Sequence, residues 1–263
     1  MWLGARWLLA LDQANLGFIV IPAAYPRPPI VEAVVELRVS GGTAWSDAEA
    51  KLLDVFKPGY PGPKRQVNAL QVQTKWRDES IETTSRRNFL KWLLPDAAGR
   101  QFVGVGPSVH SLHVLAPYPG WGKFRPAFDA TFKTFCSIMR PAAVTHVGVR
   151  YIDQIILPQE GRLDDFFRAT PPKLPSQPSG VTAFQVTIES QDPDARTTSL
   201  LTLASGPPTA EGQRVVIYDL NLTRELPEPL GLDGWSQSVD ELHARQRAIF
   251  EDSITDRTRE LFL

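Results

Sequence analysis

The sequence predicts an α+β fold in which one antiparallel sheet is built from two pseudo-repeats and carries its long helices on one face. The main observation is a β-branched strand that occurs twice, at Ile30–Val39 and at Thr145–Asp153, each time with one arginine near its end. Both copies are followed by further elements in a similar order. Short turns join most of the predicted strands, and such strands must pair antiparallel because parallel pairing needs a long crossover.

The first half follows the order β-α-β-β-β-β-α. Ile30–Ser40 alternates apolar and polar residues, which is typical of a strand with one buried face. A capping box at Ser46–Glu49 predicts the start of a helix, and Pro58 ends it. An amphipathic helix that ends at Pro141 completes this half. The strand-like runs between the two helices lie at Gln66–Trp76, Asn88–Leu94, Gln101–Val105 and His110–Leu115.

The second half follows the order β-(α)-β-β-β-α. A long strand at Ala143–Leu157 comes first, and Leu163–Arg168 is expected to form one or two helical turns. Prolines between Thr170 and Gly180 indicate a surface linker. A helix with apolar residues at helical spacing closes the chain from about Ser238. The strands in between lie at Ala183–Glu189, Ser199–Ala204 and Val215–Leu222.

The two halves, residues 26–141 and 142–263, are predicted to share a single domain. Residues 1–25 form an N-terminal extension whose apolar stretch is interrupted by Arg6 and Asp12, so it does not match a signal peptide. We expect this extension to be poorly ordered or to result from a start codon assigned too early. A short helix docked on the body is the alternative.

Composition limits the compartment and the partners. The 28 basic and 29 acidic residues give a net charge of −1, so no overall field favours nucleic acid or an anionic membrane as the partner, while a local basic patch stays open. The single cysteine, Cys136, excludes an internal disulfide framework and fits a reducing cytoplasm. No run reaches the ~20 apolar residues that a membrane span needs.

The sequence shows no catalytic, cofactor-binding or metal-binding motif. It has no Gly-x-Ser-x-Gly, no phosphate-binding glycine loop and no His-Glu-x-x-His. His110 and His113 are three residues apart in a predicted strand, so they should face opposite sides and cannot share a metal. Cys136 lies near the end of a helix and is expected to be a core thiol. We therefore assign no catalytic residue, cofactor or metal, and we favour a protein that is not an enzyme.

The charged residues of the repeated strands form the candidate polar site: Glu36, Arg38, Arg150 and Asp153. If the two strands meet near a pseudo-twofold axis, Arg38 and Arg150 should lie close together on one face. Like charges need an anion or a carboxylate between them. One interpretation is a site for a small anion or a peptide carboxylate, which the arginine fork suits. The other is structural pairing with Glu32, Glu36 and Asp153.

Aromatic residues in predicted loops are the second candidate. Tyr118 and Trp121 share a Tyr-Pro-Gly-Trp loop, and Trp235 precedes the last helix. Aromatic loop residues anchor partners, but they also cover the ends of cores. Both interpretations remain open for these three residues.

These stretches resemble an uncharacterised family of prokaryotic proteins with a sporadic distribution. The resemblance rests on Pro28–Arg38, on Pro117–Trp121 before a helix, and on Val147–Asp153, and it spans Pro26 to the C-terminal helix. Members of that family usually begin just ahead of the Pro-Pro strand, which supports an early start codon here. The resemblance implies no activity and transfers no catalytic residue.

Together these observations favour a non-enzymatic cytoplasmic binding or interaction module, of the kind that sporadic occurrence associates with mobile or defence gene systems. It would bind an unknown protein partner or a small anionic ligand. The first alternative is a ligand-binding module or enzyme with a polar pocket around Arg38 and Arg150. The second is nucleic-acid binding on an open sheet face, which the balanced charge disfavours.

Overall fold

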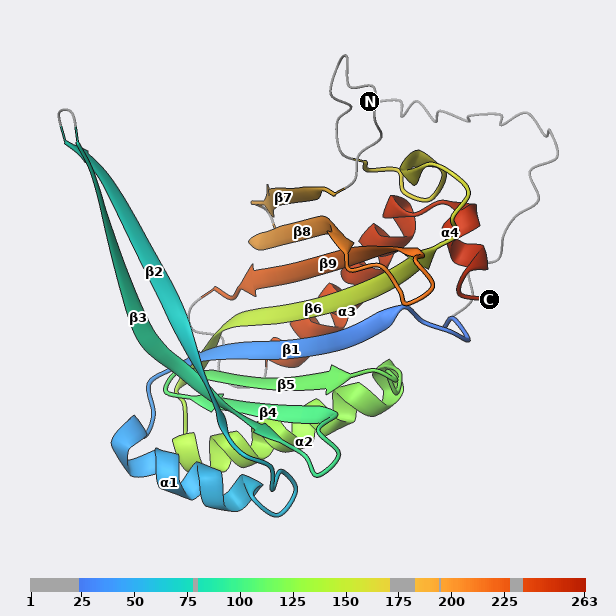
Figure 1. Ribbon diagram of the computed structural model, residues 1–263. Helices are drawn as coiled ribbons and strands as arrows, with labels where there is room; N and C mark the ends of the chain where they lie inside the picture. The colour runs from blue at the N-terminus through green and yellow to red at the C-terminus, as the bar shows by residue number, and fades with distance from the viewer. Residues whose placement is uncertain (1–23, 78–79, 171–182, 194, 228–233) are drawn as a thin grey trace, which may run out of the picture.

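The computed structural model describes residues 24–77, 80–170, 183–193, 195–227 and 234–263. The predicted extension up to residue 23 and most of the proline-rich linker lie outside these ranges. The described residues form an α+β fold with one antiparallel sheet of nine strands in the order β2-β3-β4-β5-β1-β6-β9-β8-β7 (Figure 1). The predicted fold class is therefore confirmed.

The first strand of each half lies at the centre of the sheet. β1 (Ile30–Ser40) and β6 (Ala143–Leu157) pair antiparallel there. The last strand of each half, β5 (Val109–Leu115) or β9 (Arg214–Glu225), flanks this pair. This arrangement is what two related halves would give, while the origin of the halves by repetition stays a prediction. The outer strands are β2 (Arg65–Arg77), β3 (Ser80–Pro95), β4 (Gln101–Gly106), β7 (Gln185–Asp192) and β8 (Thr197–Gly206).

The helices cover one face of the sheet and leave the other face open (Figure 1). α2 (Trp121–Met139) and α1 (Trp45–Phe56) lie over the first half, and α3 (Trp235–Ser253) packs on β6 and β9. The buried face of α2 carries phenylalanines at the predicted helical spacing. Apolar residues from both halves form a continuous core between sheet and helices. We call the covered side of the sheet the helix face and the other side the open face.

Two helix predictions need correction. α1 does not use the Ser46 capping box: the helix begins at Trp45 without a side-chain cap, and the Ser46 hydroxyl donates to Asp47. The predicted C-terminal helix is two helices, α3 and α4 (Asp256–Glu260). Ile254 is extended between them because it forms a β-bridge with Phe167, just after the 3₁₀ turn at Leu163–Asp165.

The β2–β3 hairpin extends well beyond the rest of the sheet. β3 pairs with β4 only from Trp92 to Pro95, so the earlier part of β3 pairs with β2 alone. Figure 1 shows the resulting two-stranded projection, which we call the arm (residues 65–91 of β2 and β3). The sequence predicts a strand only from Asn88, because the segment before it contains few apolar residues.

Candidate functional site

Strand alternation divides the predicted polar site between the two faces. In β1, Glu36 and Arg38 lie on the open face, and their neighbours Val35 and Leu37 are buried under the helices. In β6, Arg150 is on the open face and Asp153 is on the helix face, where it is only 2% exposed. Residues three apart in a strand point to opposite sides. The structure therefore brings Arg150 to the same face as Glu36 and Arg38, but not Asp153.

Arg38 and Arg150 do not form one site. Val34 is the register partner of Arg150 and His146 that of Arg38, so the arginines are four positions apart along the pair, about 13 Å. Arg150 makes a bidentate pair with Asp219 of β9, at 2.7 Å from Nε and 2.5 Å from Nη2. This contact raises the pKa of Arg150. The Arg38 side chain is 58% exposed, with Nε 3.9 Å from Glu36. Arg150 is thus paired with Asp219, a carboxylate that the sequence did not single out, while Arg38 stays largely exposed with only a long contact to Glu36.

A buried lysine organises the open face beside these residues. The Lys91 ammonium donates to Glu36 at 2.6 Å and to Ser111 at 2.8 Å. His113 stands next to it, with Nδ1 at 2.8 Å from Glu32 and Nε2 at 3.2 Å from Ser111. The hydrogen bond with His113 lowers the pKa of Glu32, and burial lowers the pKa of His113. At neutral pH a neutral His113 therefore donates from Nδ1 to an ionised Glu32.

The spacing of Ser111, His113 and Glu32 is that of a nucleophilic triad, but the surroundings do not support catalysis. Ser111 is fully buried, and its Oγ occupies the space that a Cβ on Gly104 would take. Its strand is paired on both sides, with β1 and with β4, so the ladder occupies the backbone N–H groups that an oxyanion hole would use. We interpret the group as a hydrogen-bonded network that joins β1, β3 and β5. As predicted, His110 lies on the other face, buried among phenylalanines.

The three candidate aromatics separate into two groups. Trp235 is buried in the core, edge-on to Phe128 and Phe132, with the Arg125 guanidinium over its ring. Trp235 therefore covers the core and is not available to anchor a partner. It is the first residue of α3, which turns its ring inward. Tyr118 and Trp121 are partly exposed and line a cavity of about 360 Å³.

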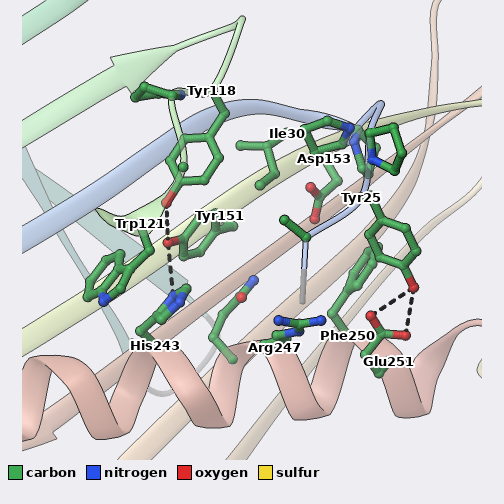
Figure 2. Close-up of a pocket in the computed structure, with 17 residues that line it drawn as sticks. Tyr25, Ile30, Tyr118, Trp121, Tyr151, Asp153, His243, Arg247, Phe250 and Glu251 are labelled. Carbon is green, nitrogen blue, oxygen red and sulfur yellow. Dashed lines mark hydrogen bonds between the residues drawn. The ribbon is translucent and has the colours of Figure 1, made fainter. Parts of the chain in front are cut away.

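The cavity lies on the helix face, between the N-terminal segment at residues 24–30, the loop at residues 118–121, β6 and α3 (Figure 2). Its N-terminal wall is fixed by Tyr25, whose hydroxyl donates to the Glu251 carboxylate at 2.8 Å. Glu251 is in turn paired with Arg259 at 2.9 Å. These contacts join the first described residues to the C-terminal helices.

A row of aromatic side chains, Tyr118, Tyr151, His243 and Trp121, forms the opposite wall. The Tyr118 and Tyr151 hydroxyls are 3.0 Å apart, and Tyr151 reaches His243 Nδ1 at 3.1 Å. Trp121 stacks on His243 with 3.9 Å between ring centroids. Burial lowers the pKa of His243 to about 4 and raises the pKa of Tyr118 to about 12. This wall is therefore uncharged at neutral pH.

Asp153 is the buried acid of the cavity, and Figure 2 shows its carboxyl group directed toward α3. Burial, with a smaller contribution from the charge of Asp219, raises the pKa of Asp153 to about 8. Within the described ranges no side chain or backbone group makes a hydrogen bond to this carboxyl group. Gln246, 5% exposed, lines the same cavity from α3. The sequence analysis chose Asp153 as a site residue but placed it on the same face as Arg150. The alternation of β6 already puts Asp153 on the buried side, and a single acid among apolar residues there could have indicated this site.

Sequence reasoning missed the arm as a site. Leu70, Val72 and Trp76 alternate along β2 on one side of the ribbon and are 61%, 54% and 78% exposed. Exposed Arg65, Lys75, Arg86 and Arg87 accompany them. Between residues 64 and 91 the chain carries seven basic and three acidic residues. The whole-chain balance of charge concealed this local excess.

Searches for a metal site and for a membrane-spanning helix among the described residues, and for related proteins, identify no further functional site. The described residues contain no group of His, Cys, Asp and Glu that could hold a metal ion. No helix among them has the length and apolarity needed to cross a membrane. No family model matches the sequence, and no curated protein matches it. The family resemblance and the site residues drawn from the sequence therefore remain predictions.

Proposed function

We propose that this protein is a non-enzymatic interaction module that binds an acidic protein partner through the β2–β3 arm. The observation that carries the proposal is the exposed apolar side of the arm, formed by Leu70, Val72 and Trp76. Alternation of this kind is the mark of a strand with one covered face. None of the described residues covers it.

The geometry of the arm favours a partner over a free surface. An isolated two-stranded ribbon is at best marginally stable in water, so a long arm that exposes large apolar residues gains from being covered. The apolar side continues toward the body, where Phe89 packs against Trp45 and Trp92 at ring-centroid distances of 5.7 Å and 5.3 Å. The base of the arm is thus anchored, and its outer part is presented to the surroundings.

The charge of the arm indicates what the partner carries. Its exposed arginines and lysine suit carboxylates at the rim of an apolar contact, where opposite charge raises the association rate and fixes the register. β2 also lies at the edge of the sheet, so a partner strand has access to its unpaired backbone groups. We assign this function to the cytoplasm on the support of the single cysteine, Cys136.

A site-specific crosslink tests the proposal. A photoreactive phenylalanine analogue would replace Trp76, and a control would carry it at Gln154, which is exposed on the open face. In the native host we expect the arm probe, but not the control, to form an adduct with another protein. The captured protein would then be purified and its binding measured with the wild type and with an L70S/V72S/W76S variant, after circular dichroism has confirmed that the variant folds.

Binding that falls at least tenfold in the variant and weakens with added salt supports the proposal. An adduct with nucleic acid would contradict the protein partner and favour nucleic-acid binding instead. Self-association through the arm in analytical ultracentrifugation, lost in the variant, would replace it with a second copy of this chain. Equal adducts at Trp76 and at the control position, or unchanged affinity in the variant, contradict the proposal.

A further inference from the structure

The cavity beside Asp153 has the features of a ligand site that is independent of the arm. Its volume of about 360 Å³ lies within the usual range for small-molecule pockets. It combines aromatic walls with two buried polar side chains that line it from different elements, Asp153 of β6 and Gln246 of α3. Neither makes a side-chain hydrogen bond within the described part of the chain.

We propose that this cavity binds an organic ammonium ion, whose N–H groups donate to Asp153 and whose carbon atoms pack against the surrounding rings. Buried polar groups are nearly always paired, so a carboxyl group left open toward a cavity calls for a donor. The rings of Tyr25, Tyr118, Trp121 and Phe250 border the same space. Aromatic faces attract cations, and this attraction is strongest where water is excluded.

Two acids, Asp153 and Glu251, and one arginine, Arg247, line the cavity. Asp153 is the deeply buried charge, at 2% exposed, whereas Arg247 is partly exposed, so the group that a ligand meets at the buried end favours a cation over an anion. Asp219, which is paired with Arg150 on the open face, does not line the cavity, but its charge adds to the raised pKa of Asp153. Glu251 lines the cavity and is neutralised by Arg259. His243 stays neutral above about pH 4, its pKa lowered by burial and by the charge of Arg247. An ammonium ion would supply the positive charge that a buried, ionised Asp153 needs.

This site should make binding dependent on pH. Because Asp153 in the free protein is protonated below about pH 8, a cation must displace that proton, and its affinity should fall up to tenfold for each pH unit below 8. A primary amine remains protonated over this range, as lysine does. The titratable and charged groups that border Asp153 from the packed elements are Tyr25, Tyr151, Tyr218, Asp219, His243, Arg247 and Glu251.

The test compares three probes of equal chain length by calorimetric titration of the full chain: butylammonium, 1-butanol and butyrate. We expect butylammonium to bind at least tenfold more tightly than the other two at pH 8, and its affinity to decrease toward pH 6. Asp153→Asn should abolish the binding of butylammonium and its pH dependence. The substitution should be tolerated, because Asp153 is neutral in the free protein near pH 7. Gln154→Ala, on the opposite face, is the matched control and should bind as the wild type does.

If Asp153→Asn fails to fold, Phe250→Leu removes a ring at similar volume and should weaken butylammonium severalfold more than 1-butanol. Several results would overturn the proposal: equal affinity for the alcohol and the amine, tighter binding of butyrate, or unchanged amine binding in either variant. Failure of butylammonium to bind the wild type at any pH between 6 and 9 would do the same. None of these outcomes bears on the arm.

Discussion

Asp219 lies on the open face of the sheet, yet its charge helps raise the pKa of Asp153 on the helix face. The two residues are on adjacent strands, with Asp219 the register partner of Ile152. Burial is the larger cause of the shift. Through this pair, the polar network of the open face influences the acid in the cavity.

Asp219→Asn should therefore lower the pKa of Asp153 below about 8. The decrease should be small, because burial, which the substitution leaves in place, causes the larger part of the shift. Carbon-13 NMR titration of the Asp153 carboxyl group measures this directly. Asn221→Ala, two residues along the same strand, removes no charge and should leave the titration unchanged. A pKa that stays at about 8 in Asp219→Asn would show that the two faces are electrostatically independent.

Asp153 should also make the protein less stable as the pH rises. Its folded-state pKa of about 8 exceeds the unfolded value of about 3.9, so between these values the folded state binds more protons than the unfolded state. Stability from this group is then lost by up to about 1.4 kcal/mol per pH unit as the pH rises toward 8, and no further loss follows above it. Urea unfolding at pH 7.0 and 8.0 should show this slope in the wild type, and a smaller slope in Asp153→Asn. Identical slopes in the two proteins would contradict a buried, protonated Asp153.

His110 should contribute the opposite dependence in acid. It is fully buried, its Nδ1 has no partner among the described residues, and burial lowers its pKa to about 3. Because the unfolded imidazole has a pKa of about 6.5, the unfolded state takes up a proton first as the pH falls from 6.5 toward 3. Between pH 7.5 and pH 5 this should cost about 2 kcal/mol of stability.

His110→Phe should reduce that acid loss by about the same amount, because the ring still packs between phenylalanines while the titration disappears. Guanidinium unfolding at both pH values provides the measurement. The comparison is the change between pH values within each protein, so a packing defect that is independent of pH cancels. A His110→Phe protein that loses as much stability in acid as the wild type would contradict the prediction.

Lys91 and Glu36 should be energetically coupled. Lys91 is almost fully buried, so Lys91→Met leaves Glu36 and Ser111 without their donor and should destabilise the protein by about 2–4 kcal/mol. Glu36→Gln alone leaves a buried cation and should also destabilise. The double variant should lose less than the sum of the two, which a double-mutant cycle in urea detects. Arg38→Met, at an exposed position, is the control and should change stability by less than about 0.5 kcal/mol. Additive losses would mean that the network contributes through separate contacts.

Local sequence patterns determined much of the architecture. The alternation in Ile30–Ser40 and in Ala143–Leu157 identified both central strands, and the short connections required antiparallel pairing. The same alternation placed Glu36 with Arg38 and separated His110 from His113. It could also have separated Asp153 from Arg150, since three residues in a strand reverse the face.

Tertiary structure decided the sites. The pairing register placed Arg38 and Arg150 about 13 Å apart and gave Arg150 the partner Asp219, and no pattern within either strand fixes that register. The cavity joins Tyr25, Tyr118, Asp153 and Glu251, which lie far apart in the chain and meet only when α3 packs on β6. The arm depends on where β3 leaves β4, which is a property of the whole sheet. Sequence periodicity records which way a side chain points, whereas a site depends on what lies opposite it, and that is set by long-range packing.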